Sequence, residues 1–184
     1  MRNKRFITLA ALACVALATA GIAIAAKSGG VSAASATFAT ATVSDSVTKT
    51  CSIAGGDTYS FTRATYNGTS TSTDARLNGP MTVKTVSILD VTTGIGAVVG
   101  NFKIDGAGHA RAHGKIEGAL AAGQLSGMVR AHVDKPGGEL FAGVNGGFTQ
   151  AAGFTAASLG AGSAADSGVV LFHGQCVKEI PLGW

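Results

Sequence analysis

The residues best suited to chemistry lie between 109 and 134, where histidines, basic residues and carboxylates recur at alternate positions. A histidine beside a carboxylate can transfer protons, and two histidines with a carboxylate can bind a metal. Regularly alternating charges of both signs are also typical of the solvent-facing side of a sheet, and we favour this interpretation. The polar positions are His109, Arg111, His113, Lys115, Glu117, Arg130, His132 and Asp134.

Spacing limits what this polar face can bind. His109 and His113 would lie about 13 Å apart on one strand, too far to share a metal ion. We therefore expect neither a metal site nor a cofactor. Side chains that point into a cavity would favour catalysis, and side chains that point to solvent would favour a scaffold. The candidate residues on this face are His109, His113, Glu117, His132 and Asp134.

A second candidate site consists of aromatic, cationic and histidine side chains that could line the mouth or interior of a barrel. Many positions expected on the inner face are Gly or Ala, which could leave space for a small apolar ligand. Ordinary core packing is the alternative interpretation of the same residues. The candidate ligand-binding residues are Tyr59, Phe61, Arg63, Phe102 and His173.

The first 26 residues are predicted to be a signal peptide. Arg2, Lys4 and Arg5 precede an uncharged run over 6–26, and Ala23-Ile24-Ala25 has the small-x-small form of a cleavage site. A permanent membrane anchor is the alternative. Cleavage predicts a secreted or periplasmic protein, and the Ala-rich leader is typical of bacteria. The chain would then contact the membrane only through the signal peptide, before cleavage.

Removal of the leader lowers the formal net charge from +4 to +1, so the pI of 9.2 partly reflects the export signal. No concentrated basic stripe with interleaved aromatic residues accompanies it, and we predict no nucleic-acid partner. Cys51 and Cys176 remain, and an even pair in an oxidising compartment is most simply a disulfide. It would close a loop of about 125 residues and contribute roughly 4–5 kcal/mol.

The remaining chain is predicted to be all-β. Its composition, 46% hydrophobic and 13% charged, argues against a largely disordered chain. Residues 27–46 are expected to be a flexible Ser/Thr/Ala-rich spacer. From 47 to 184, Gly-containing turns separate segments in which apolar and polar residues alternate. The predicted strands are 47–54, 57–66, 80–92, 95–105, 108–118, 123–134, 138–149 and 168–178.

These segments predict an antiparallel up-and-down barrel of about eight strands, which resembles the architecture of calycins and of allene oxide cyclases. The first and last strands would be neighbours, and the Cys51–Cys176 disulfide would join them where the sheet closes. Cys176 shares strand parity with Val170 and Phe172, which places it on an apolar face. Recurrent Gly within the strands would allow the sheet to bend.

Three functions are compatible with these features. The favoured one is a secreted, non-catalytic barrel that binds a small apolar ligand or a partner in the cell envelope. The alternative is an isomerase or cyclase acting on a small hydrophobic substrate inside the barrel, which the likeness in architecture allows but does not require. A small outer-membrane barrel is the third, less favoured because aromatic residues make up only 6% of the chain.

Overall fold

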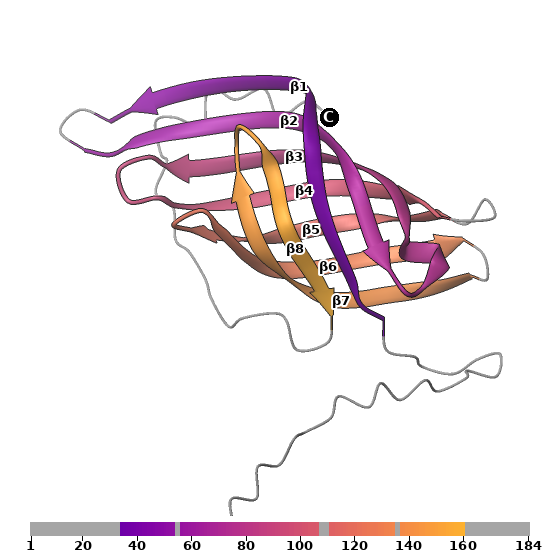
Figure 1. Cartoon of the computed structure of the whole chain (residues 1–184). Helices are drawn as coiled ribbons and strands as arrows, with labels where there is room; N and C mark the ends of the chain where they lie inside the picture. The colour runs from indigo at the N-terminus through magenta and orange to yellow at the C-terminus, as the bar shows by residue number, and fades with distance from the viewer. Residues whose placement is uncertain (1–33, 54–55, 107–110, 135–136, 161–184) are drawn as a thin grey trace, which may run out of the picture. The chain divides into compact units, whose positions relative to one another are not determined.

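A computed structural model describes residues 34–53, 56–106, 111–134 and 137–160. Consecutive strands pair antiparallel, and the first pairs with the last, so eight strands form a closed barrel (Figure 1). The predicted all-β, antiparallel barrel is therefore confirmed. The elements are β1 (Ala36–Ser52), β2 (Thr58–Ser72), the short 3-10 helix η1 (Ala75–Leu77), β3 (Gly79–Asp90), β4 (Ile95–Asp105), β5 (Arg111–Ala121), β6 (Gln124–Asp134), β7 (Gly137–Thr149) and β8 (Gly153–Gly160).

Along the strands of the barrel wall, buried apolar residues alternate with exposed polar residues. In β4, Val98, Phe102 and Ile104 are buried while Asn101 and Lys103 face solvent. Such one-sided strands place an apolar face on the core and a polar face in water. Among the described residues there is no helix long and apolar enough to cross a membrane.

The barrel closes at the beginning of β1, where Ala36 pairs with Leu159 and Phe38 pairs with Ala157. The prediction that 168–178 is the closing strand is therefore wrong, because β8 occupies that place. Past Phe38, β1 leaves β8, bends, and runs on beside β2 alone among the described strands (Figure 1). Two register shifts, near Thr40 and near Val43, accompany this bend.

Cys51 lies far from the closure, near the end of β1 and opposite Tyr59 of β2. Cys176 lies outside the described residues, so its disulfide with Cys51 remains a prediction. The strand β1 also begins at Ala36, inside the segment expected to be a spacer. Thr alternates there with buried Ala36 and Phe38, and Thr suits a strand as well as it suits a linker.

The interior of the barrel is apolar and its exterior carries the charged residues. The core includes Phe38, Val83, Ile104, Leu125 and Val144 from five different strands. This polarity is the reverse of that of membrane-spanning barrels, whose outer band is apolar. It therefore speaks against the outer-membrane alternative.

Asp90 organises the turn between β3 and β4. Its carboxylate accepts hydrogen bonds from the Thr92 amide at 2.8 Å, the Thr93 amide at 3.3 Å and the Thr93 hydroxyl at 2.8 Å. Burial alone would raise the pKa of Asp90, but the hydrogen bonds from Thr93 and Thr92 outweigh it and lower that pKa. The ionised carboxylate therefore stabilises the folded state.

Acid is expected to remove this contribution. Because the folded pKa is depressed, the stabilisation is complete above the unfolded value of about 3.9 and is lost as pH falls through the folded value. Asp90→Asn should lower the melting temperature at pH 7 and flatten its dependence on pH below about 4. Thermal unfolding followed by circular dichroism from pH 7 to pH 2 measures both. Parallel curves for the two proteins would contradict this role.

Candidate functional site

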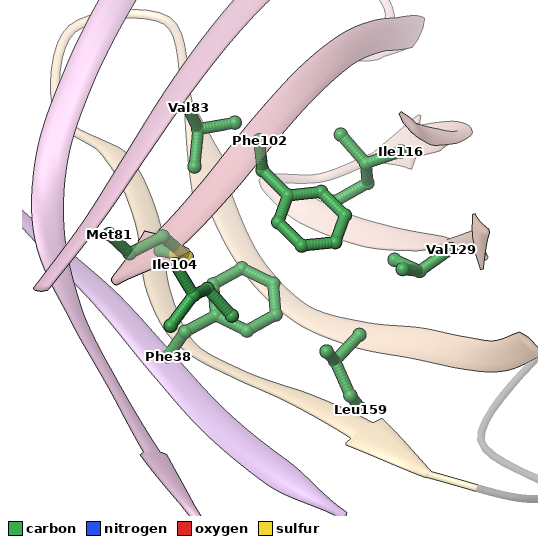
Figure 2. Close-up of a pocket in the computed structure, with 8 residues that line it drawn as sticks. All are labelled: Phe38, Met81, Val83, Phe102, Ile104, Ile116, Val129 and Leu159. Atoms are coloured by element: carbon green, nitrogen blue, oxygen red, sulfur yellow. The ribbon is translucent and has the colours of Figure 1, made fainter. Parts of the chain in front are cut away.

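The lumen contains an apolar cavity that is almost completely filled. Its lining comes from six strands, and side chains point into it from all sides (Figure 2). The remaining cavity of about 10 Å³ has room for one water at most. Because all the lining side chains are apolar, such a cavity stays dry. The lining residues are Phe38, Met81, Val83, Phe102, Ile104, Ile116, Val129 and Leu159.

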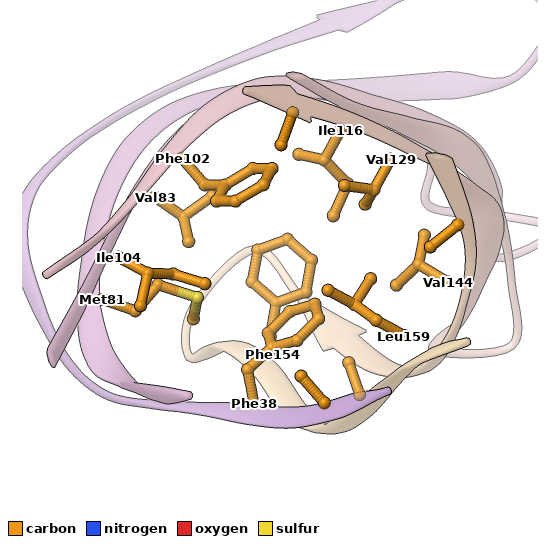
Figure 3. Packing of buried hydrophobic residues seen from close by; sticks show 14 of the residues in the cluster. Phe38, Met81, Val83, Phe102, Ile104, Ile116, Val129, Val144, Phe154 and Leu159 are labelled. Carbon is orange, nitrogen blue, oxygen red and sulfur yellow. The ribbon is translucent and has the colours of Figure 1, made fainter. Parts of the chain in front are cut away.

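Aromatic rings fill the part of the lumen beside the closure. The ring of Phe154 lies 5.3 Å from that of Phe38 and 4.9 Å from that of Phe148, measured between centroids. Tyr66 meets Phe148 and Phe154 edge-on at 6.0 and 6.4 Å. Figure 3 shows Phe38 and Phe154 directed into the barrel. These rings occupy the space that the many Gly and Ala residues were expected to leave open.

A buried network of neutral polar groups lies among β2, β3 and the β7–β8 turn. The Tyr66 hydroxyl donates to the Gln150 carbonyl at 2.8 Å. The Gln150 side chain accepts from the Ser60 hydroxyl at 2.9 Å and donates to the Ser87 hydroxyl at 3.0 Å. Burial raises the pKa of Tyr66, and a contact with Thr85 only partly offsets this. The phenol is therefore neutral at pH 7, and its proton is already donated within the network.

The sequence offered little sign of this network. Ser60 and Ser87 occupy inward positions of their strands, but Ser is equally common on exposed faces. Gln150 lies in a turn, and its side chain turns back over the barrel to reach both serines. Long-range pairing of this kind depends on the closed topology. The network holds the β7–β8 turn against the sheet.

The predicted ligand-binding residues are not brought together. Phe102 lines the cavity. Tyr59 and Phe61 instead belong to a separate cluster with Cys51, Ile53 and Ile88. Arg63 shares their strand parity and faces solvent. These three were expected at the mouth or interior of the barrel, but the inward positions of β2 are the even ones, so all three lie at its outward positions. His173 lies outside the described residues.

The predicted polar face does assemble, on the outside of the barrel. His113 and His132 are directly opposed on β5 and β6, with ring centroids 5.7 Å apart. Asp134 lies 3.6 Å from His113 Nδ1, and Glu139 lies 3.1 Å from His132 Nδ1. Glu117 also faces solvent, and His109 lies outside the described residues.

This outward orientation favours a scaffold over a catalytic centre. The four groups His113, His132, Asp134 and Glu139 are exposed to water, where ion pairs contribute little. Within the described residues, no group of three or more histidine, cysteine or carboxylate side chains is arranged to hold a metal.

Next to these histidines lies a group of exposed side chains that we call the basic–apolar patch: Lys115, Met128, Arg130 and Phe141. Phe141 is 62% exposed and Met128 is 55% exposed. Arg130 packs over the Phe141 ring, 5.4 Å from its centroid. Lys115 and Arg130 stand directly opposite each other, and among the described residues neither pairs with a carboxylate.

The sequence indicated the two cations of the basic–apolar patch but not its exposed aromatic residue. Alternation placed Lys115 and Arg130 on the polar face, and the structure confirms that placement. Phe141 interrupts the alternation, because an aromatic residue occupies an outward position of β7 between Glu139 and Gly143. An aromatic residue at an outward position was the signal that could have identified the patch.

Comparison with protein-family models, curated proteins and solved structures finds no match to this chain. The assignment of a function therefore depends on the side chains themselves.

Proposed function

We propose that this protein is an exported, non-catalytic β-barrel that binds another protein of the cell envelope through the basic–apolar patch. The observation that carries the proposal is the exposure of Phe141 and Met128 beside two cations that lack a described carboxylate partner. Aromatic residues, Met and Arg are the types enriched at protein interfaces. Export is supported by the sequence pattern over 1–26, a positive start followed by an uncharged apolar run, which predicts a signal peptide.

The filled lumen argues against a ligand carried inside the barrel. A ligand of even a few heavy atoms needs far more than about 10 Å³, so Met81 or Phe102 would have to move out of the core. The interior polar network is hydrogen-bonded to itself and holds no ionised group. Binding is therefore assigned to the outside of the wall.

The patch selects an acidic partner. Like charges directly opposite each other on a sheet destabilise it, so the Lys115–Arg130 pair carries a repulsion that an incoming carboxylate would relieve. A shallow hollow beside this pair is lined by Lys115, Arg130, Ala131, His132 and Glu139, so a carboxylate placed there would be attracted by the two cations and repelled by Glu139. Phe141 and Met128 supply the apolar contact area next to it. A protein segment with a carboxylate beside an apolar side chain fits both parts.

The test is site-specific photo-cross-linking in the cells that export the protein. A benzoylphenylalanine at position 141 should form an adduct with one envelope protein, whereas the same group at Lys84, which is exposed on β3, should not. Lys115→Glu with Arg130→Glu should reduce the adduct more than tenfold, because charge is reversed where the partner carboxylate binds. Lys84→Glu is the matched control. Equal adducts from both sites, or no effect of the charge reversal, would contradict the proposal.

A further inference from the structure

Two histidines border the basic–apolar patch on the outer wall of the barrel. His113 precedes Lys115 by two residues on β5, and His132 follows Arg130 by two residues on β6. Alternate residues of a strand lie about 7 Å apart on the same face, so each imidazole is the neighbour of one cation of the patch. The two histidines are directly opposed to each other, as are the two cations. A row of two titratable groups therefore lies next to a row of two fixed positive charges.

Each of these histidines has a carboxylate beside it. His132 Nδ1 lies 3.1 Å from Glu139 Oε1, which is hydrogen-bonding distance. Asp134 Oδ1 lies 3.6 Å from His113 Nδ1 and 3.9 Å from His132 Nε2, so it is close to both rings. The four side chains are in contact with water, and a proton can reach either ring without any opening of the barrel. An imidazolium formed at either position has a carboxylate with which to pair.

The other charged groups that face the histidine pair are of types that keep their charge near neutral pH. Lys103 of β4 is directly opposite His113, and Arg111 precedes His113 by two residues. Asp105 of β4 lies 2.9 Å from Lys103 Nζ and 3.4 Å from Arg111 Nε. Histidine ordinarily changes its charge between pH 5 and pH 8, whereas lysine, arginine and carboxylate side chains do not. Among the described residues, a change of charge at this surface in that range therefore comes from His113 and His132.

Protonation of the pair changes what an incoming carboxylate meets. With both imidazoles neutral, the two cations Lys115 and Arg130 are balanced by the carboxylates of Asp134 and Glu139. With both imidazoles protonated, the same surface carries two net positive charges. Glu139 and His132 both line the hollow beside the patch. An imidazolium at His132 pairs with Glu139 and offsets the repulsion between Glu139 and the partner's carboxylate.

We propose that the His113–His132 pair makes binding at the basic–apolar patch dependent on pH, so that the acidic partner binds more tightly in mild acid than above neutrality. This inference rests on the proposed function and adds the condition under which the patch is occupied. His132 acts inside the hollow through Glu139, and His113 acts from the neighbouring strand through Asp134. Because coupling between two binding events is reciprocal, binding of the partner also takes up protons at these two imidazoles.

Photo-cross-linking from position 141 in isolated cell envelopes, buffered at pH 5.5 or at pH 8.0, tests this inference. The protein with both histidines should give at least fivefold more adduct at pH 5.5, because the surface then carries the added positive charge. His113→Gln with His132→Gln should give equal adduct at the two pH values, since glutamine is polar and does not titrate. Lys84→Gln, a change of an exposed residue on β3, is the matched control and should keep the pH dependence.

Glu139→Gln gives a result that a loss of folding cannot imitate. This variant lacks the repulsion inside the hollow at every pH, so its adduct at pH 8.0 should be at least threefold greater than that of the protein with Glu139. The inference is overturned if the adduct does not vary with pH, if the double glutamine variant keeps the pH dependence, or if Glu139→Gln does not raise the adduct at pH 8.0. The absence of any adduct at both pH values would instead overturn the proposed function, and the inference with it.

Discussion

Replacing Phe154 by alanine is expected to lower the free energy of unfolding by about 3–5 kcal/mol. Phe154 is 1% exposed, and its ring contacts Phe38 of β1, Tyr66 of β2 and Phe148 of β7. This loss includes the transfer free energy of the ring, the cost of the cavity left behind, and the loss of three aromatic contacts. Urea denaturation of the purified protein measures the change.

Phe141→Ala is the matched control, because it removes the same side chain from an outward position of β7 that is 62% exposed. We expect a change within about 0.5 kcal/mol, as for most surface substitutions. Similar losses for the two variants would mean that the ring of Phe154 does not lie inside the barrel.

Gly153→Ala is expected to lower the free energy of unfolding by about 2–4 kcal/mol, because the added methyl group is crowded and the backbone is strained. Gly153 has a φ of +79° at the start of β8, a conformation that disfavours any Cβ. An added Cβ would lie 2.5 Å from Thr40 Oγ1 and 2.6 Å from Tyr66 Cδ1. The Thr40 hydroxyl is itself fixed, accepting from the Phe154 amide at 2.8 Å and donating to the Ala152 carbonyl at 2.7 Å.

Gly123→Ala separates backbone strain from crowding. Gly123 has a nearly identical φ of +77° in the two-residue turn between β5 and β6, and an added Cβ would meet nothing within 4 Å. Gly123→Ala should therefore lower the free energy of unfolding by only about 1 kcal/mol, from backbone strain alone. Equal losses at the two glycines, measured by urea denaturation, would contradict the close approach of β8 to Thr40 and Tyr66.

Alternation and turn glycines were enough to predict most of the barrel wall. The segment expected at 95–105 is β4 with the same bounds, and 123–134 differs from β6 by one residue. Both have large aliphatic side chains on one face and charges on the other, and a Gly-containing turn begins or ends each. Where local pattern and burial agree in this way, the sequence is sufficient.

The closure could not be predicted because its residues carry weak local signals. In β8, glycines, a positive φ at Ala156 and a register shift opposite β7 obscure the alternation. The Thr-rich start of β1 matches the composition of a linker. Pairing of these two segments depends on long-range packing of Phe38 against Phe154, which no local pattern reveals.

The candidate site was predicted in part for similar reasons. The strand register brought His113, His132 and Asp134 together, as alternation required. Tyr59 and Phe61 were expected at the mouth or interior of the barrel, and the structure places them instead in a separate cluster at outward positions of β2, because strand parity and not aromatic character decides the face. Gln150 was missed because a turn residue gives no sign of where its side chain points.

The central claim is that β8 closes the barrel against the beginning of β1, and a pair of cysteines tests it most directly. Thr37 and Ser158 are exposed, directly paired residues of these two strands. The Thr37→Cys, Ser158→Cys variant should form a cross-link under mild oxidation, because paired positions lie within disulfide reach. Val47→Cys with Ser158→Cys should form none. A cross-link in the second pair and not in the first would contradict the closed barrel described above.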